Sequence, residues 1–201
     1  MPENVTRQAA MLIALFLAAP PARAQFFDPL SLAGRALTVV IDARTASEVK
    51  TDVEISAGAN KRLLDSKEAE WKSVSLLVFA QHVVLAGAVQ SERAKKLVEK
   101  LVREDKSIRS LTNDLVVVRK KGDEGSFVAD TALDTEINAV LTAAKGVSSV
   151  NMRWKAVNGN VILMGITRSK EEAKLAVEKI KGLKSVKAVK SRLRVVPKKS
   201  K

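Results

Sequence analysis

Residues 83–87 read Val-Val-Leu-Ala-Gly, and residues 161–165, 78 positions further along, read Val-Ile-Leu-Met-Gly. At this offset, residues 52–118 align with residues 130–196 without a gap, and 15 of the 67 aligned positions are identical. Self-similarity at a fixed offset indicates repeated structural units. The sequence therefore predicts two tandem copies of one small domain.

Apolar residues align with apolar residues through most of the remaining register, for example Ile55 with Leu133 and Val74 with Met152. Each copy has about 67 residues, near the lower limit at which one core holds a fold without disulfides or metals. The chain contains no cysteine. We therefore expect the two copies to stabilise each other through an interface.

The second copy shows the order of elements most clearly. Apolar residues with a 3.6-residue period predict a helix that Asp130 caps. Alternation over residues 150–156 predicts a half-buried strand, Asn158-Gly159 a tight hairpin turn, and residues 161–164 the returning strand. Ser169 with Glu172 forms a capping-box pattern for a second helix, and residues 188–196, like 110–118 in the first copy, predict the last strand.

This order predicts an α+β protein of two tandem two-layer domains. Each domain is αββαβ, with a three-stranded mixed sheet, two helices on one face and the other face open. The connection through the second helix implies a parallel strand pair. Gly87 and Gly165 share parity with the core-facing strand residues, so we expect the missing side chains to let a helix lie close.

The segment from Val83 to Gly87, the following Ser91 and the closing apolar pattern through Val117 resemble the BON family, the bacterial OsmY and nodulation domain. The second copy, with Gly165 and Val195, resembles it again. The resemblance implies a periplasmic or envelope protein that binds phospholipid surfaces, protects against stress or supports envelope integrity, without enzymatic activity. Members attached to membranes carry a lipid-bearing cysteine, which this chain lacks.

The N-terminal residues indicate export. Arg7 precedes an apolar run, and Ala22-Arg23-Ala24 fits signal-peptidase cleavage before Gln25. This apolar run is too short to span a bilayer, although a membrane anchor or a disordered tail remains the alternative. We expect a signal peptide (1–24), an N-terminal extension (25–50), a first domain (51–118), a linker (119–126), a second domain (127–197) and a basic tail (198–201).

Positive charge is concentrated in the second half of the chain. Lys and Arg exceed Asp and Glu by one over residues 51–118, and by ten from Phe127 to the C-terminus. Alternation places five basic side chains on the open sheet face of the second copy, where anionic phospholipid or another envelope polyanion could bind. A solvated face without a ligand is the alternative. These candidate residues are Arg153, Lys155, Lys190, Arg192 and Arg194.

The open face of the first copy is apolar instead. Its candidate residues, for an interdomain contact or a partner, are Leu77, Phe79, Val84 and Val116. An apolar sheet face should not remain in water. We expect it to pack against the second copy or against residues 26–49, and a site for envelope protein partners is the alternative.

The sequence offers little support for catalysis, a metal or a cofactor. His82, the only histidine, lies at the predicted hairpin turn, and no zinc-ligand spacing or phosphate loop is present. Trp154 aligns with a core position, whereas Trp71 has no counterpart. Few aromatic residues and the export signal argue against nucleic acid binding.

Two hypotheses for function remain. In the first, the basic second domain binds an anionic envelope surface. In the second, a chaperone-like stress protein uses the apolar face of the first domain to cover client proteins.

Overall fold

The computed structural model describes residues 42–67, 73–118 and 125–197. In the first repeat the elements follow the predicted order, except that the last strand is split in two by Asp114 and Leu115. These elements are α2 (Ala46–Asp65), β1 (Val74–Phe79), β2 (His82–Val89), α3 (Glu92–Arg103), β3 (Ser110–Asn113) and β4 (Val116–Val117).

The second repeat follows the same order with an unbroken last strand. One turn of 3-10 helix, η2 (Ser149–Asn151), replaces the start of the predicted first strand. The other elements are α4 (Phe127–Ala143), β5 (Met152–Val157), β6 (Asn160–Thr167), α5 (Lys170–Lys181) and β7 (Ala188–Val195).

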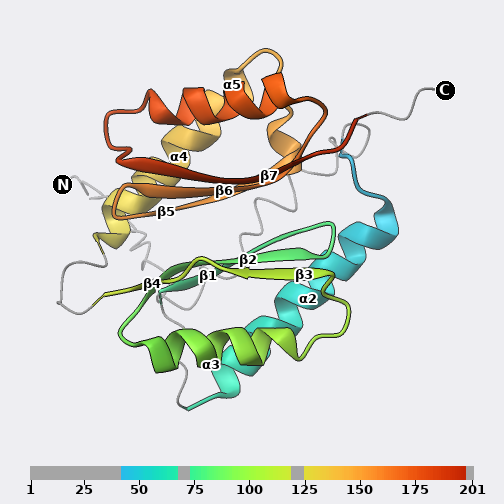
Figure 1. The fold of residues 1–201 in the computed structure, drawn as a ribbon, viewed down its shortest axis with the longest axis vertical. Coiled ribbons are helices and arrows are strands. Elements are labelled where there is room, and N and C mark those ends of the chain that lie inside the picture. The colour runs from blue at the N-terminus through green and yellow to red at the C-terminus, as the bar shows by residue number, and fades with distance from the viewer. Residues whose placement is uncertain (1–41, 68–72, 119–124, 198–201) are drawn as a thin grey trace, which may run out of the picture.

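The two repeats together form four layers, as Figure 1 shows. Helices α4 and α5 cover the outer face of the β5–β7 sheet, and α2 and α3 cover the outer face of the β1–β4 sheet. The inner faces of the two sheets are turned toward each other. The α+β class and the two-layer organisation of each domain are confirmed.

Each sheet is built around its second strand. Strand β2 pairs antiparallel with β1, in a register that places Leu76 opposite Leu85, and parallel with β3. Strand β6 pairs antiparallel with β5 and parallel with β7. The predicted parallel pair is therefore present in both domains.

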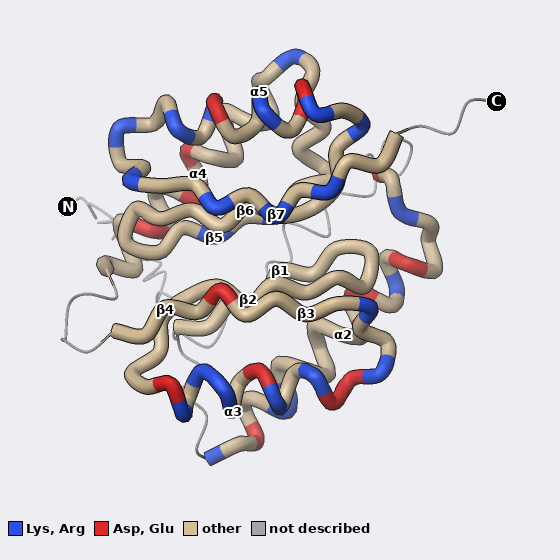
Figure 2. The backbone as a smooth tube through the Cα atoms, in the orientation of Figure 1, with Lys and Arg blue, Asp and Glu red and all other residues tan. Residues whose placement is uncertain are grey.

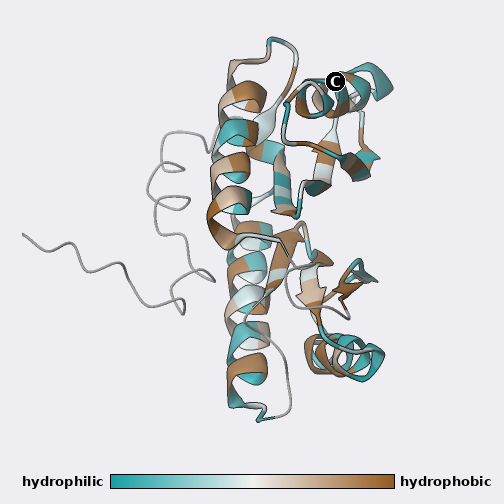
Figure 3. Cartoon of the chain, turned by 90° about the vertical axis from the view of Figure 1, so that its left-hand side faces the viewer, coloured by the Kyte–Doolittle hydropathy of each residue, from teal (hydrophilic) through white to brown (hydrophobic). Residues whose placement is uncertain are grey.

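Each domain has its own core between sheet and helices. In the first domain, Ile55, Val98 and Leu85 are fully buried. In the second, Ile137, Leu163 and Ile180 take the corresponding roles. Trp154 packs against this second core, as predicted, and its indole N–H donates to the Asp134 carbonyl. Figure 3 shows hydrophilic and hydrophobic residues alternating along the helices and along several strands, as expected for elements that bury one face.

The first helix of each repeat begins earlier than the sequence suggested. Ser126 caps α4, its hydroxyl accepting from the Ala129 N–H, and Thr45 caps α2 in a capping box with Glu48. The prediction that Asp130 is a cap is therefore wrong. Asp130 and its counterpart Asp52 lie inside the helices and are buried.

The capping box predicted at Ser169 forms only in part. The Ser169 hydroxyl accepts from the Glu172 N–H at 3.1 Å. The Glu172 carboxylate does not return to Ser169 but accepts from the N–H groups of Ser148 at 2.8 Å and Arg168 at 2.7 Å. Buried Glu172 thereby ties the loop before η2 to the start of α5.

The two matched glycines are required by a neighbouring strand, not by a helix. Their φ angles are +125° at Gly87 and +131° at Gly165. A Cβ atom would lie 1.9 Å from the Ser73 carbonyl oxygen at Gly87, and 2.1 Å from that of Asn151 at Gly165. The expectation that these positions admit a helix was wrong, because the close approach is made by the backbone that leads into β1 or β5.

The hairpin turns of the two domains share a geometry but not a sequence. Asn158 and Gly159 have φ angles of 49° and 74°, which confirms the predicted turn. In the first domain, Ala80 and Gln81 adopt the same left-handed conformation, at 51° and 65°, without a glycine. Such a turn is strained for ordinary residues and needs outside support.

Several expectations fall outside the described residues. They concern the signal peptide, most of the N-terminal extension, linker residues 119–124, the basic tail and Trp71. Within the described ranges, none of the helices combines the length and the apolar character that crossing a membrane requires.

Candidate functional site

The inner faces of the two sheets meet in an apolar layer, which we call the shared interface. Phe79 is 1% exposed within it, and Ala43, which precedes α2, lies at its margin. The structure places three of the four predicted apolar residues here and leaves the fourth, Val116, 50% exposed. The buried members are Leu77, Phe79, Val84 and Ala86 from the first domain and Ile162, Met164 and Ile166 from the second.

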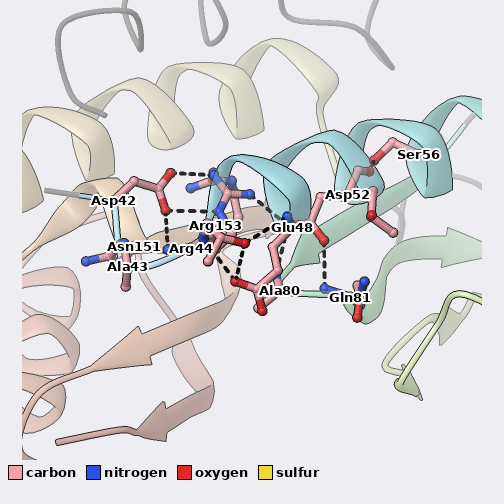
Figure 4. Close-up of polar contacts among 12 residues, drawn as sticks. Asp42, Ala43, Arg44, Glu48, Asp52, Ser56, Ala80, Gln81, Asn151 and Arg153 are labelled. Carbon is pink, nitrogen blue, oxygen red and sulfur yellow. Dashed lines mark hydrogen bonds and ion pairs between the residues drawn. The ribbon is translucent and has the colours of Figure 1, made fainter. Parts of the chain in front are cut away.

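Charged groups lie beside Phe79 at one end of the shared interface. Figure 4 shows Asp42, Arg44 and Asp52 of this network together with Arg153 of the second domain. The guanidinium of Arg44 lies 4.4 Å from the ring centroid and that of Arg153, from the second domain, lies 5.3 Å away. Arg44 also forms ion pairs with Asp42 at 2.6 Å and Asp52 at 2.8 Å. Cations over an aromatic face are stabilising, more so when they are desolvated.

Asp52 supports the strained turn of the first domain. Its carboxylate accepts from the N–H of Ala80 at 2.8 Å and of Gln81 at 2.6 Å, while Arg44 balances its charge. Sequence reasoning missed this role. The signal was present in the identity of Asp52 and Asp130 within the repeat.

The segment before α2 joins the two domains. The Ala43 N–H donates to the Asn151 side chain of the second domain at 2.8 Å. Burial alone would raise the pKa of Asp42, but hydrogen bonds from Arg44 outweigh it, and the pKa lies below its usual value. Asp42 therefore remains a carboxylate that fixes Arg44 between the domains.

A second charged contact crosses the interface at its opposite rim. The buried carboxylate of Asp114 accepts from Lys190 at 2.6 Å and from both Nε and Nη2 of Arg192 at 2.8 Å. Burial alone would raise the pKa of Asp114, but the hydrogen bonds from Arg192 and Lys190 outweigh this effect and hold the pKa below its usual value. Asp114 is thus held in its charged form as a bridge to β7.

The structure separates the five predicted anion-binding residues into three environments. Lys190 and Arg192 take part in the Asp114 bridge, yet their side chains remain 56% and 38% exposed. Arg153 is half-buried beside Phe79, and its guanidinium donates to backbone carbonyls of its own domain. Lys155 pairs with Asp134 of α4 at 2.6 Å, and Arg194 is exposed.

The second sheet therefore does not present an open basic face, because the first domain covers its centre. Lys155 and Asp134 both belong to the second domain, so their ion pair is an internal contact of that domain. Burial raises the pKa of Asp134, and Lys155 opposes this rise. The exposed positive charge lies instead along β7 and over α5, where Figure 2 shows most Lys and Arg of this domain. We call this surface the basic flank: Lys187, Lys190, Arg192 and Arg194 with Lys170, Lys174, Lys179 and Lys181.

The described residues offer no group of three or more His, Cys, Asp or Glu that could hold a metal ion. His82 stands at the start of β2, half-buried, with its Nδ1 2.5 Å from the Ser110 hydroxyl. Burial and the nearby positive charges of Arg194 and Arg109 lower the pKa of His82 below its usual value. The lowered pKa favours the neutral form of this imidazole.

Comparison with known proteins gives two curated relatives, each covering about seven-tenths of the chain. A protein of Anaplasma centrale, described as an uncharacterized protein in the gshII 5′ region, is 28% identical over 144 residues, covering 72% of this chain and 94% of the relative. The osmotically-inducible protein Y of Escherichia coli strain K12 is 27% identical over 144 residues, covering 71% of this chain and 72% of the relative.

Among solved structures, the chain is similar to the C-terminal domain of CdsD, a structural protein of the type III secretion system of Chlamydia trachomatis. That likeness has 16% sequence identity and a TM-score of 0.30, and it covers 68% of this chain and 64% of the other. The BON domain model matches residues 51–119 and again residues 129–197, one match for each repeat of helix, hairpin, helix and strand. The chain thus belongs to the BON domain family and carries two of its domains in tandem.

Proposed function

We propose that this protein is a non-enzymatic periplasmic or envelope protein whose second BON domain contacts anionic phospholipid, or another envelope polyanion, in support of envelope integrity. The observation that carries the proposal is the basic flank, which stays exposed although the inner sheet face is covered. The name of the E. coli relative, an osmotically inducible protein, supports a role linked to envelope stress.

The charge arrangement favours a surface contact over a pocket. Each basic residue near an anionic membrane contributes about 1 kcal/mol, and salt weakens the attraction. The second domain and its tail carry an excess of ten positive charges, and the first domain an excess of one. Binding should therefore depend on the second domain and on ionic strength.

The five candidate residues differ in how available they are to an anionic headgroup, and this difference predicts how much each contributes to binding. Arg194 is exposed, and Lys190 and Arg192 expose part of their side chains while holding Asp114. Arg153 and Lys155 have internal partners, so a headgroup would have to displace these contacts. We expect Arg194, Lys190 and the α5 lysines to contribute most.

Co-sedimentation with lipid vesicles tests the proposal. The chain from Gln25 to Lys201 should pellet with phosphatidylglycerol-containing vesicles at low salt, less at moderate salt, and not with neutral vesicles. Charge reversal at Arg194 and Lys174 should remove most of this pelleting, since both are exposed and outside the Asp114 bridge. Arg192 is a poorer choice, because its loss would leave buried Asp114 with fewer partners.

The matched control is charge reversal at Lys61 and Lys100, which are exposed on the helices of the first domain. It changes the net charge equally but leaves the basic flank intact, so pelleting should persist. Pelleting that both double variants lose equally would indicate a response to net charge alone. That result, or no pelleting at either salt, would contradict the proposal.

The alternative, a chaperone-like stress protein that binds clients through the first domain, requires the domains to separate. Leu77, Phe79 and Val84 are buried against the second domain. If it held, the wild-type chain would suppress aggregation of an unfolded client, and Phe79→Asp would abolish this suppression while both domains stay folded. Equal suppression by the variant, or none by the wild type, would exclude it.

A further inference from the structure

Strand β7 is an open edge of the second sheet. The strand order is β5-β6-β7, and within the described residues no strand pairs with the outer side of β7. All eight of its residues are exposed or half-buried. An edge of this kind presents unpaired backbone groups that can template an added strand.

The corresponding edge of the first domain is blunted. Its strand is divided into β3, of four residues, and β4, of two, by Asp114 and Leu115. Asn113 fills the break, since its side chain accepts from the Leu115 N–H and donates to the Lys95 carbonyl. Strand β7 has no such interruption, so the two repeats differ in whether their edge can extend.

The outward backbone groups of β7 can be assigned from alternation along the strand. The Val196 N–H donates inward to the Thr167 carbonyl at 2.8 Å, which places the N–H groups of odd-numbered residues on the outer side. In agreement, the Leu193 N–H makes a long contact, 3.4 Å, with the hydroxyl of its neighbour Ser191. Ser191 and Leu193 therefore offer backbone groups to the open edge.

The side chains of β7 select the charge of an added strand. Lys190, Arg192 and Arg194 alternate on one face, and opposite charges directly across a strand pair are stabilising while like charges are not. Antiparallel pairing with β7 of a second copy, centred on Arg192, would place positive charges opposite each other. Acidic side chains at every second position would match the pattern.

We infer that β7 accepts an extended acidic segment of a partner protein as an added strand of the second sheet. Backbone groups of Ser191 and Leu193 bind the main chain of the segment, and its carboxylates pair with the basic side chains of β7. In this mode the backbone provides affinity, and the alternating side chains provide specificity.

The probe is a fluorescein-labelled, end-capped peptide that alternates glutamate and valine over seven residues, measured by fluorescence anisotropy against the chain from Gln25 to Lys201. The peptide should bind. Ser191→Pro should weaken binding by about tenfold or more, since proline removes the outward N–H of this residue. The fold should persist, because edge strands tolerate proline. Ser191→Thr, the matched control, keeps that N–H and should change affinity by less than about twofold.

A measurement on the backbone of the wild-type chain keeps the inference testable even if the proline variant misfolds. The peptide should slow hydrogen exchange of the Ser191 and Leu193 amides, and a lysine-valine peptide of the same length should not bind. Failure of the acidic peptide to bind, or equal binding by Ser191→Pro without protection of these amides, would overturn the inference.

The test is separable from that of the vesicle contact. Lys174→Glu lies on α5, away from the β7 backbone, and should reduce vesicle pelleting while leaving peptide affinity within about twofold. Ser191→Pro should do the opposite. If vesicles bind and the peptide does not, the strand-addition inference fails while the lipid proposal stands.

Discussion

Gly165 and Gly87 show how the absence of a Cβ atom decides the local fold. Each lies in the middle strand of its sheet with a φ angle that side chains rarely adopt, and each faces a carbonyl oxygen of the incoming strand. The identity of the two positions in the repeat predicted their importance. The alternation of side chains along each strand predicted which face of the sheet the glycine lies on. It did not predict which backbone lies against the glycine, because alternation along a strand carries no information about how closely an adjacent backbone passes.

Replacement of Gly165 by alanine should lower the free energy of unfolding by about 3 kcal/mol or more, because the Cβ meets the Asn151 oxygen and the φ angle is strained. Urea unfolding followed by circular dichroism measures the change. Gly182→Ala is the control: its φ is −71° and its Cβ would make only ordinary contacts, so it should be neutral or slightly stabilising. Equal effects of the two changes would refute this account of Gly165.

His82 should make stability depend on pH. Its pKa is lowered in the folded chain by burial and by Arg194 and Arg109, although Asp52 acts in the opposite sense. The unfolded chain therefore binds a proton more readily, so stability is retained above the ordinary value of 6.5 and decreases as the pH falls below it.

This decrease can be isolated because the chain has one histidine. Urea unfolding of wild type and His82→Asn at about pH 7.5 and about pH 5.5 should show a larger loss for the wild type on acidification. Identical losses would mean that His82 does not contribute.

At the scale of an element, the β1–β2 hairpin contains a strained turn that the β5–β6 hairpin avoids. Gln81→Gly should raise the free energy of unfolding by about 0.5–1 kcal/mol, because Gly adopts the left-handed region freely and the N–H to Asp52 remains. Gln81→Val should be destabilising, since a β-branched side chain disfavours this conformation. A glycine variant no more stable than wild type would show that Asp52 already removes the strain.

Strands were easier to predict than helix starts. Alternation over residues 150–156 and the Asn158-Gly159 turn predicted the hairpin of the second copy, and the repeat extended that prediction to the first. The helix between the second and third strands predicted the parallel pairing. The helix starts were placed too late, since Asp130 resembles a cap while the residues directly after Ser126 and Thr45 show no helical apolar period. The carboxylate of Asp52 serves a turn distant in sequence, which local patterns do not reveal.

At the scale of the whole molecule, the interface contains an ion pair between two equivalent positions of the repeat that carry opposite charges. Asp114 and Arg192 align in the repeat, and they pair with each other across the two sheets. Duplication followed by opposite charges at one position thus produced a contact between the copies. The excess positive charge of the second copy was visible in the sequence, but its partial use by Asp114 was not, because sheet-to-sheet packing has no local signal.

A buried charge in the shared interface should separate the domains. Met164→Glu places a carboxylate among Leu77, Val84 and Ile162, at a cost of about 3 kcal/mol or more. Each domain retains its own core, so urea unfolding should become broader or split into two transitions. Val128→Glu, at an exposed position of α4, should leave the transition unchanged, and a single unchanged transition in Met164→Glu would contradict mutual stabilisation.

The central claim is that the two BON domains close sheet to sheet and leave the basic flank exposed. Methyl nuclear Overhauser spectroscopy on the unmodified chain tests it most directly. We predict cross-peaks between methyl groups of Leu77 and Val84 in the first domain and those of Ile162 and Met164 in the second. Contacts within each domain core without any between these two sets would contradict the closed arrangement, and would return the second sheet to the open basic face that the sequence first suggested.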